Sequence, residues 1–270
     1  MSEETNMGRL EGKGAVVLGA AGKDNMGQVI ARRFAAEGAK VLVAGRKIEP
    51  LQAFADEIGG HAAVCDIVNR AEVFALADTA KEKLGNVQIA VNAAAIAPLI
   101  PFLENTEEQL KTLSDILFVG PFFFMQAMIQ AMDHGGSIIQ ISSATATIQL
   151  NDHAAYQGGK AAADHVIRCA ANEFGSRNIR LNSISPGLTD TPMTAGAKAT
   201  PGVYEAFLPS YPLGRVGTSE DIAAAAVFLA SDECFMTGQN LQVNGGLTLR
   251  RNPTREEITA SVMAHAGAKA

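Results

Sequence analysis

The sequence has 270 residues, 47% of them hydrophobic, and a formal net charge of −6. This length gives one large domain or two small ones, no apolar run is long enough to indicate a membrane span, and an acidic balance without a basic block argues against nucleic acid and anionic membranes as partners. The start is unlike a secretory or transit peptide, and the cysteines and histidines lack metal or redox spacing, so we expect a cytoplasmic protein with reduced thiols and no metal.

Short β-branched runs alternate with longer amphipathic stretches along the chain. The runs that fit strands are residues 15–20, 40–45, 61–66, 87–92, 137–142, 179–184 and 240–245. Nearly all-apolar strands that alternate with helices are typical of a parallel sheet covered on both faces. Right-handed crossovers then give a doubly wound α/β fold. Because no linker and no repeat interrupts the pattern, we predict a single domain.

The turn after the first predicted strand is rich in glycine and leads into a helix. Gly19, Gly22 and Gly27 let the backbone bend tightly, and the helix that begins near Met26 directs its positive end at the same place. A diphosphate is the natural occupant of such a site, although a plain tight turn could use the same glycines. The spacing is not G-x-G-x-x-G, so the prediction depends on the position of the turn after the first strand.

The ends of the second and third predicted strands concern the type of cofactor. An acidic residue after the second strand would bind a ribose 2′-hydroxyl, but Gly45 and Arg46 stand there. Arginine can hold a 2′-phosphate by paired, charge-assisted hydrogen bonds, so we predict NADP rather than NAD, with Lys23 as a second cation. Alternatively, Arg46 is solvated or stacks on adenine. Asp66 and Ile67 follow the third strand and are placed to border the adenine ring.

The stretch AYQGGK, residues 155–160, opens a predicted helix with two glycines between a tyrosine and a lysine. Tyr156 and Lys160 are one helical turn apart and share a face. An ammonium about 4 Å from a phenol, at an effective dielectric near ~20, contributes roughly 4 kcal/mol, or about three pKa units. Desolvation opposes this effect, but we expect the pKa of Tyr156 to fall toward the range of general acid–base catalysis. Gly158 and Gly159 would let another helix or the cofactor approach closely.

Ser143 follows the fifth predicted strand and precedes the helix that carries the tyrosine. A hydroxyl at this place can hydrogen-bond the oxygen of a carbonyl or alcohol. A serine, a tyrosine and a lysine that meet at one edge of the sheet therefore predict acid–base chemistry on such a group.

The connection from Thr191 to Pro212 is long for a compact domain and contains several prolines and glycines. A loop of this kind is usually a lid or a binding loop. Its apolar residues would suit an oily substrate, or they would only pack the lid onto the body of the protein, and both interpretations stay open. These residues are Met193, Val203, Tyr204, Phe207 and Leu208.

Together these features resemble the short-chain dehydrogenase/reductase family, in the branch that includes the 3-oxoacyl-acyl-carrier-protein reductases. The residues that carry the resemblance are the glycine turn, Asp66, VNAAAI (91–96), ISS (141–143), the tyrosine–lysine pair, IRLNSISPG (179–187) and the block 211–246. The resemblance implies a Rossmann fold with seven parallel strands. It also implies hydride transfer between a nicotinamide and a carbonyl or secondary alcohol, and a small or medium hydrophobic substrate suits the lid.

The resemblance further implies roles for single residues. Tyr156 would be the proton donor or acceptor, Ser143 would bind the substrate oxygen, and Lys160 would bind the nicotinamide ribose and lower the pKa of the tyrosine. The remaining implied cofactor contacts come from Gly19, Gly22, Asn25, Met26, Gly27, Asn92, Ala93, Pro186, Gly187, Thr189 and Thr191. Family members are usually tetramers, sometimes dimers, built on the helices that correspond to residues 106–132 and 153–175.

Three positions depart from the family pattern. The glycine turn carries two extra residues, with Asn25 where the middle glycine aligns, and the family's N-N-A-G has become residues 92–95, NAAA. Leu117 stands where the family has an asparagine that holds a water of the proton relay. Because leucine cannot hold that water, the alternative function is a catalytically silent dinucleotide-binding subunit or sensor.

Residues 248–270 extend beyond the usual end of the family. Thr254 and Glu257 have the spacing of a capping box, which predicts a short helix. This helix would cover the pocket of a neighbouring subunit or be a loose end, and the sequence does not decide between the two.

Overall fold

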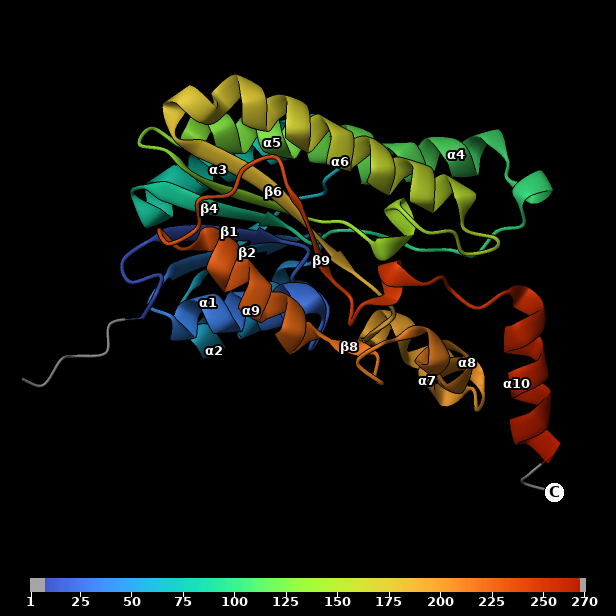
Figure 1. The fold of residues 1–270 in the computed structure, drawn as a ribbon. Coiled ribbons are helices and arrows are strands. Elements are labelled where there is room, and N and C mark those ends of the chain that lie inside the picture. Colours follow the sequence, from blue (N-terminus) through green and yellow to red (C-terminus); the bar gives the residue numbers. More distant parts are fainter. Residues whose placement is uncertain (1–7, 268–270) are drawn as a thin grey trace, which may run out of the picture.

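The computed structural model describes residues 8–267, and it has three layers with a sheet between two groups of helices (Figure 1). Within these residues the main sheet has seven strands in the order β3-β2-β1-β4-β5-β6-β9, all paired in parallel. The predicted doubly wound α/β fold is therefore confirmed. The strands are β1 (Gly14–Leu18), β2 (Lys40–Gly45), β3 (His61–Val64), β4 (Val87–Asn92), β5 (Gly136–Ile141), β6 (Ile179–Pro186) and β9 (Asn240–Val243).

Helices cover both faces of this sheet, and each face has its own hydrophobic core. The helices α1 (Met26–Ala36), α2 (Ile48–Ile58) and α9 (Ser219–Ala230) lie on one face, and α3 (Arg70–Leu84), α5 (Gly120–Ala131) and α6 (Ala154–Phe174) lie on the other (Figure 1). Successive strand residues point to opposite faces: in β1, Val16 and Leu18 pack in one core while Ala15 and Val17 pack in the other. This is why the strands read as continuous apolar runs.

The strand order reverses between β1 and β4, because β2 and β3 lie on one side of β1 and the later strands lie on the other. Ligands of open α/β sheets bind in the crevice at such a point, outside the carboxyl ends of the strands. The glycine turn after β1 and the segments after β4, β5 and β6 all leave the sheet at this edge. The fold thus gathers the predicted site residues from distant parts of the sequence.

The long connection predicted as a loop contains short helices. They are η5 (Pro192–Thr194), α7 (Ala195–Ala199), α8 (Val203–Phe207) and η6 (Leu208–Ser210), and the strands β7 (Thr189–Asp190) and β8 (Gly217–Thr218) pair at its base. Phe207 is buried in a cluster with Ala144, Tyr211 and Leu247, whereas the side chain of Met193 is 61% exposed. Phe207 therefore packs the lid onto the body of the protein, and contact between the lid's other apolar residues and an oily substrate stays a prediction.

A continuous helical run joins α4 (Glu107–Ser114), a π-helical segment at Asp115–Val119 and α5. The run Glu107–Ala131 is long and apolar enough to cross a membrane by length and composition, but half of its most apolar window is buried inside the fold. It packs against α3 and α6, so its hydropathy reflects its place in the core of this face.

The extension after β9 forms a short turn, η7 (Leu247–Leu249), and the helix α10 (Arg255–Gly267). The predicted capping box is confirmed, since the Thr254 N–H donates to Glu257 Oε2 at 2.7 Å and the Glu257 N–H donates to Thr254 Oγ1 at 3.2 Å. The helix packs on α8 of its own chain, beside the lid in Figure 1. It is therefore not a loose end.

Candidate active site

A cavity of about 720 Å³ lies at the carboxyl edge of the sheet. It extends from the glycine turn, past the tyrosine–lysine helix, to the lid and α10. The predicted site residues that line it are Gly19, Asn25, Met26, Gly27, Ala93, Ser143, Tyr156, Lys160, Pro186, Gly187, Thr189 and Thr191. One continuous cavity therefore joins most of the predicted cofactor contacts to the predicted catalytic group.

The backbone around Ser143 is held by β6. The Ser142 N–H donates to the Ile184 carbonyl at 2.7 Å, and Ser185 Oγ donates to the Ser143 carbonyl at 3.1 Å. Ser143 Oγ accepts the Thr145 N–H at 3.1 Å and lies 2.8 Å from Thr145 Oγ1. The hydroxyl is therefore fixed at the cavity wall by bonds that do not depend on the lid.

Lys160 is buried, with 2% of its surface exposed, and its Nζ donates to the Ile141 carbonyl at 2.7 Å. The same ammonium lies 5.6 Å from the centre of the Tyr156 ring. Burial lowers the pKa of Lys160 to about 8, and the negative charge of Asp164 opposes this fall. The lysine is thus held beside the tyrosine by β5.

The expected fall in the pKa of Tyr156 is not what this structure gives. Burial raises the pKa of Tyr156 to about 12, and a hydrogen bond with the side chain of Ser143 opposes that rise. The physical reason is that desolvation penalises the phenolate, while the lysine bonds to a carbonyl and lies over the ring. Burial is therefore the dominant influence on the pKa of Tyr156 in this structure.

The two glycines between Tyr156 and Lys160 have different surroundings. A Cβ at Gly159 would lie 2.8 Å from Leu117 Cβ, whereas a Cβ at Gly158 would meet nothing within 4 Å. Gly159 thus allows the π-helical segment to pack closely on α6, which confirms the expected close approach of another helix. Leu117 is 1% exposed and fills the space beside this turn.

A buried polar cluster next to Lys160 was not predicted from the sequence. Ser142 Oγ and Asn240 Nδ2 each donate to Asp164 Oδ2 at 2.7 Å, and among residues 8–267 Asp164 Oδ1 has no hydrogen-bond partner. Burial raises the pKa of Asp164, although its hydrogen bonds and Lys160 lower it. The spacing of Tyr156, Lys160 and Asp164 at four-residue intervals on one helix was the available signal.

The longer glycine turn is closed by two amide side chains. Asn25 is the N-cap of α1: its Oδ1 accepts the Gln28 N–H at 2.9 Å and its Nδ2 donates to the Gly19 carbonyl at 2.8 Å. Gln28, which the sequence did not single out, donates from Nε2 to the Ala20 carbonyl at 3.0 Å. Gly19 has φ +98°, and a Cβ there would lie 2.6 Å from the Ala94 nitrogen, so this position needs glycine.

The other predicted cofactor residues do not line the cavity. Gly22 lies within the turn, and Arg46 is exposed directly after β2. Asp66 accepts the Val68 N–H at 3.2 Å, and Ile67 is 5% exposed and belongs to a hydrophobic core.

Asn92 is fully buried, and both ends of its amide are occupied within the protein. Its Nδ2 donates to Gln140 Oε1 at 2.9 Å, and its Oδ1 accepts the Ala94 N–H at 3.0 Å. In this structure it fixes the turn after β4 rather than facing the cavity.

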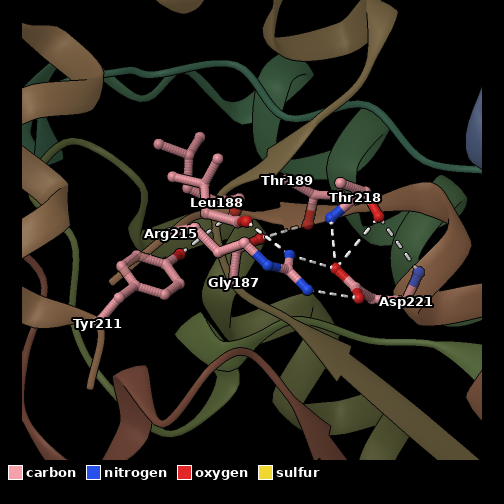
Figure 2. Close-up of polar contacts among 8 residues, drawn as sticks. Gly187, Leu188, Thr189, Tyr211, Arg215, Thr218 and Asp221 are labelled. Carbon is pink, nitrogen blue, oxygen red and sulfur yellow. Dashed lines mark hydrogen bonds and ion pairs between the residues drawn. The ribbon is translucent and has the colours of Figure 1, made fainter. Parts of the chain in front are cut away.

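The base of the lid is held by the polar contacts in Figure 2. Tyr211 Oη donates to the Leu188 carbonyl at 3.3 Å, and it leaves no room for a side chain at Gly187. Arg215 donates to both carboxylate oxygens of Asp221, at 2.6 and 2.8 Å. These contacts join the segment after β6 to the end of the lid at Tyr211, and they join Arg215, which follows the lid, to the start of α9.

Comparisons with known proteins agree with this geometry. The family model described as "Enoyl-(Acyl carrier protein) reductase" matches residues 19–248. D-threitol dehydrogenase of Mycolicibacterium smegmatis is 36% identical over 251 residues, which cover 90% of this chain and 95% of the relative. The 7alpha-hydroxysteroid dehydrogenase of Escherichia coli is 36% identical over 248 residues, covering 88% of this chain and 95% of the relative. A short-chain type dehydrogenase/reductase from Mycobacterium ulcerans superposes with a TM-score of 0.86 at 30% identity, over 90% of this chain and 92% of that chain.

Proposed function

The chain belongs to the short-chain dehydrogenase/reductase family and is an oxidoreductase that acts on CH–OH groups, and we propose that it transfers hydride between NADP(H) and a carbonyl or secondary alcohol of a small to medium-sized substrate. The observation that carries this proposal is the single cavity that joins the amino end of α1 to Ser143, Tyr156 and Lys160. The silent-subunit alternative rested on Leu117 alone, and the dehydrogenase relatives favour catalysis.

Three side chains account for the proton side of the reaction. Ser143 orients the substrate oxygen, and Tyr156 gives that oxygen a proton in reduction and takes one in oxidation. In the proposed mechanism Lys160 supplies a positive charge near the phenol, which favours the phenolate, while in this structure the Ser143 hydrogen bond opposes the effect of burial on the Tyr156 pKa. When bound, the nicotinamide supplies or accepts the hydride.

The residues around the glycine turn fit a dinucleotide. The first N–H groups of α1 lack intrahelical partners, Met26 and Gly27 line the cavity, and the first turn of α1 carries no acidic residue. This is a suitable place for a diphosphate. Lys160 would hold the nicotinamide ribose, and the exposed Arg46 after β2 supports a 2′-phosphate and hence NADP.

The cavity wall near the lid supports a hydrophobic part in the substrate. Met193, Val203, Phe207 and Leu247 line it. The relatives act, by their names, on D-threitol and on 7α-hydroxysteroids, so both polyols and larger alicyclic alcohols belong in a substrate panel. A small or medium alcohol or ketone fits these observations.

Exposed apolar side chains support a homotetramer or homodimer. Phe102, Leu103, Leu110 and Phe122 are 76%, 95%, 48% and 39% exposed, and they lie on or directly before α4 and α5. Light scattering coupled to size-exclusion chromatography measures the mass in solution, and a monomer at micromolar concentration would contradict this part of the proposal. We also propose a cytoplasmic location, which the free thiols of Cys65, Cys169 and Cys234 support.

The proposal is tested by following nicotinamide absorbance with ketones plus NADPH or NADH, and with secondary alcohols plus the oxidised cofactors. We expect turnover with NADPH to exceed turnover with NADH, and Arg46→Ala to reduce this preference. Lys47→Ala is the matched control, because Lys47 is the next exposed cation after β2. Better turnover with NADH than with NADPH in the wild type would overturn the choice of NADP. No turnover with any combination of substrate and cofactor would overturn the proposed hydride transfer.

A further inference from the structure

Part of the cavity wall is built by the extension, nearly all of which lies beyond the residues that the family model matches. The family match ends at residue 248, yet Asn252, Arg255, Ile258 and Thr259 line the same cavity as Ser143 and Tyr156. Figure 1 shows α10 standing against the lid helices of its own chain. The extension is therefore part of the site.

The position of α10 is fixed from several sides. Asn252 is 5% exposed and donates from Nδ2 to the Gln149 carbonyl at 3.0 Å. Ile258 packs on the buried cluster that includes Phe207. At Gly202, a Cβ would lie 2.6 Å from the Ser261 carbonyl oxygen, so lid and helix approach at backbone distance. The backbone of α10 is thus held against the lid and the loop at Gln149.

One of these side chains forms an ion pair across the cavity wall. Arg255 Nη2 donates to Asp152 Oδ1, and the side chains are 55% and 24% exposed. Asp152 lies in the loop after β5, in the left-handed region with φ +62°, one residue before His153. His153 in turn packs on Tyr156, with ring centres 4.2 Å apart. The pair therefore belongs to the same wall as the catalytic tyrosine.

The pair offers a specific kind of binding chemistry. A guanidinium has five N–H donors, and a carboxylate adds acceptor sites, while the two charges cancel. A neutral hydroxyl both donates and accepts, so it can satisfy both partners at once. The Asp152 carboxylate would repel an anionic group, and the Arg255 guanidinium would repel a cationic group. As a surface ion pair alone it would stabilise the fold only slightly.

We propose that Asp152 and Arg255 form a second subsite, which binds a hydroxyl group of the substrate remote from the carbon that is oxidised or reduced. This inference rests on the proposed function and names its substrate class: neutral alcohols or ketones with at least one further hydroxyl. Arg255 and Asp152 are specificity-determining residues in this scheme, and the proton transfer stays with Tyr156.

The test compares a diol with the mono-alcohol of the same carbon skeleton, for example cyclohexanediols with cyclohexanol, and straight-chain C4–C6 pairs. We expect the wild type to prefer the diol in kcat/KM. Arg255→Ala should reduce that preference about tenfold, as the loss of a hydrogen bond to a charged group does, mainly through KM. Arg255→Lys should restore part of it. Arg251→Ala is the matched control, since Arg251 is in the same extension but pairs with Glu257 outside the cavity lining.

The subsite would be overturned if Arg255→Ala reduced kcat/KM equally for the diol and the mono-alcohol. It would also be overturned if the wild type had a higher kcat/KM for the mono-alcohol. If no alcohol is turned over, the proposed function fails. Saturation-transfer NMR then measures whether the protein binds the diol more strongly than the mono-alcohol. In that case, equal binding of the diol by wild type and Arg255→Ala overturns the subsite. Thermal unfolding of each variant shows that the differences do not come from misfolding.

Discussion

The two sides of the cavity are built in different ways. On the side of the proposed catalytic residues, Lys160 is bonded to a β5 carbonyl and the Ser143 carbonyl accepts a hydrogen bond from a β6 serine side chain, and α6 packs through Gly159 on a buried leucine. On the other side, the short helices and α10 share a small apolar cluster, and an ion pair on the surface joins α10 to the loop at Asp152. In the proposed mechanism, this difference puts the residues for proton transfer on the core of the fold and the residues for substrate selectivity on a cover, formed by the short helices and α10, outside that core.

The strongest test of the catalytic side is Tyr156→Phe. The ring and its packing against His153 are kept while the hydroxyl is lost. We expect turnover to fall about 10²–10⁴-fold, the usual contribution of general acid–base catalysis, with the affinity for NADPH nearly unchanged in a fluorescence titration. Wild-type turnover in this variant would show that Tyr156 is not the proton donor or acceptor.

The electrostatics behind the lysine are tested by Asp164→Asn. The Asp164 charge opposes the fall in the pKa of Lys160, which burial brings to about 8. Without that charge, Lys160 should lose its proton at lower pH, so the high-pH limb of kcat/KM should move to lower pH. Ser142→Ala is the control, because it removes a hydrogen bond to the same carboxylate and keeps the charge. An unmoved limb in Asp164→Asn would show that Asp164 has only a structural role.

The packing of the catalytic helix is tested by a pair of glycine variants. Gly159→Ala places a Cβ against Leu117 and should destabilise the protein by about 1–3 kcal/mol, as overpacking does. Gly158→Ala meets no neighbouring atom within 4 Å and should be neutral or stabilising by up to ~1 kcal/mol. Denaturant unfolding followed by circular dichroism measures both. Equal effects would mean that the helices are not in the close contact described.

The smallest effect is expected on the cover. Thr254→Ala removes the side-chain acceptor of the α10 capping box and should weaken that helix by about 1 kcal/mol. Because α10 lies outside the sheet and its two cores, hydrogen exchange should become faster in residues 255–266 while global unfolding hardly changes. Faster exchange throughout the sheet would show that cover and core are not separate units.

The sequence predicted the seven strands and the proximity of Tyr156 and Lys160 because both depend on local spacing. Alternating apolar runs define strands wherever they pair, and Tyr156 and Lys160 share a face on any helix. The direction of the pKa of Tyr156 could not be predicted in the same way, because it depends on how deeply the rest of the fold buries the ring.

The features that the sequence missed depend on contacts between distant segments. The polar cluster at Asp164 depends on Ser142 and Asn240, which come from distant parts of the sequence. The local sequence gives only a weak helix signal for the π-helical segment at Leu117 and for the short helices of the lid. Tertiary packing determines the conformation of both. The docking of α10 required knowing that Gly202 faces Ser261, which no periodicity along the chain reports.

The place of α10 has a practical consequence for handling the protein. The described chain begins near the β1 side of the molecule, whereas α10 lies beside the lid at the opposite end in Figure 1. An affinity tag or an immobilisation linker joined at the amino end would therefore leave the pocket wall untouched. A fusion at the carboxyl end would lie next to α10, which lines the cavity. Comparing the activity of the two fusion proteins would show whether a group attached beside α10 disturbs the cavity.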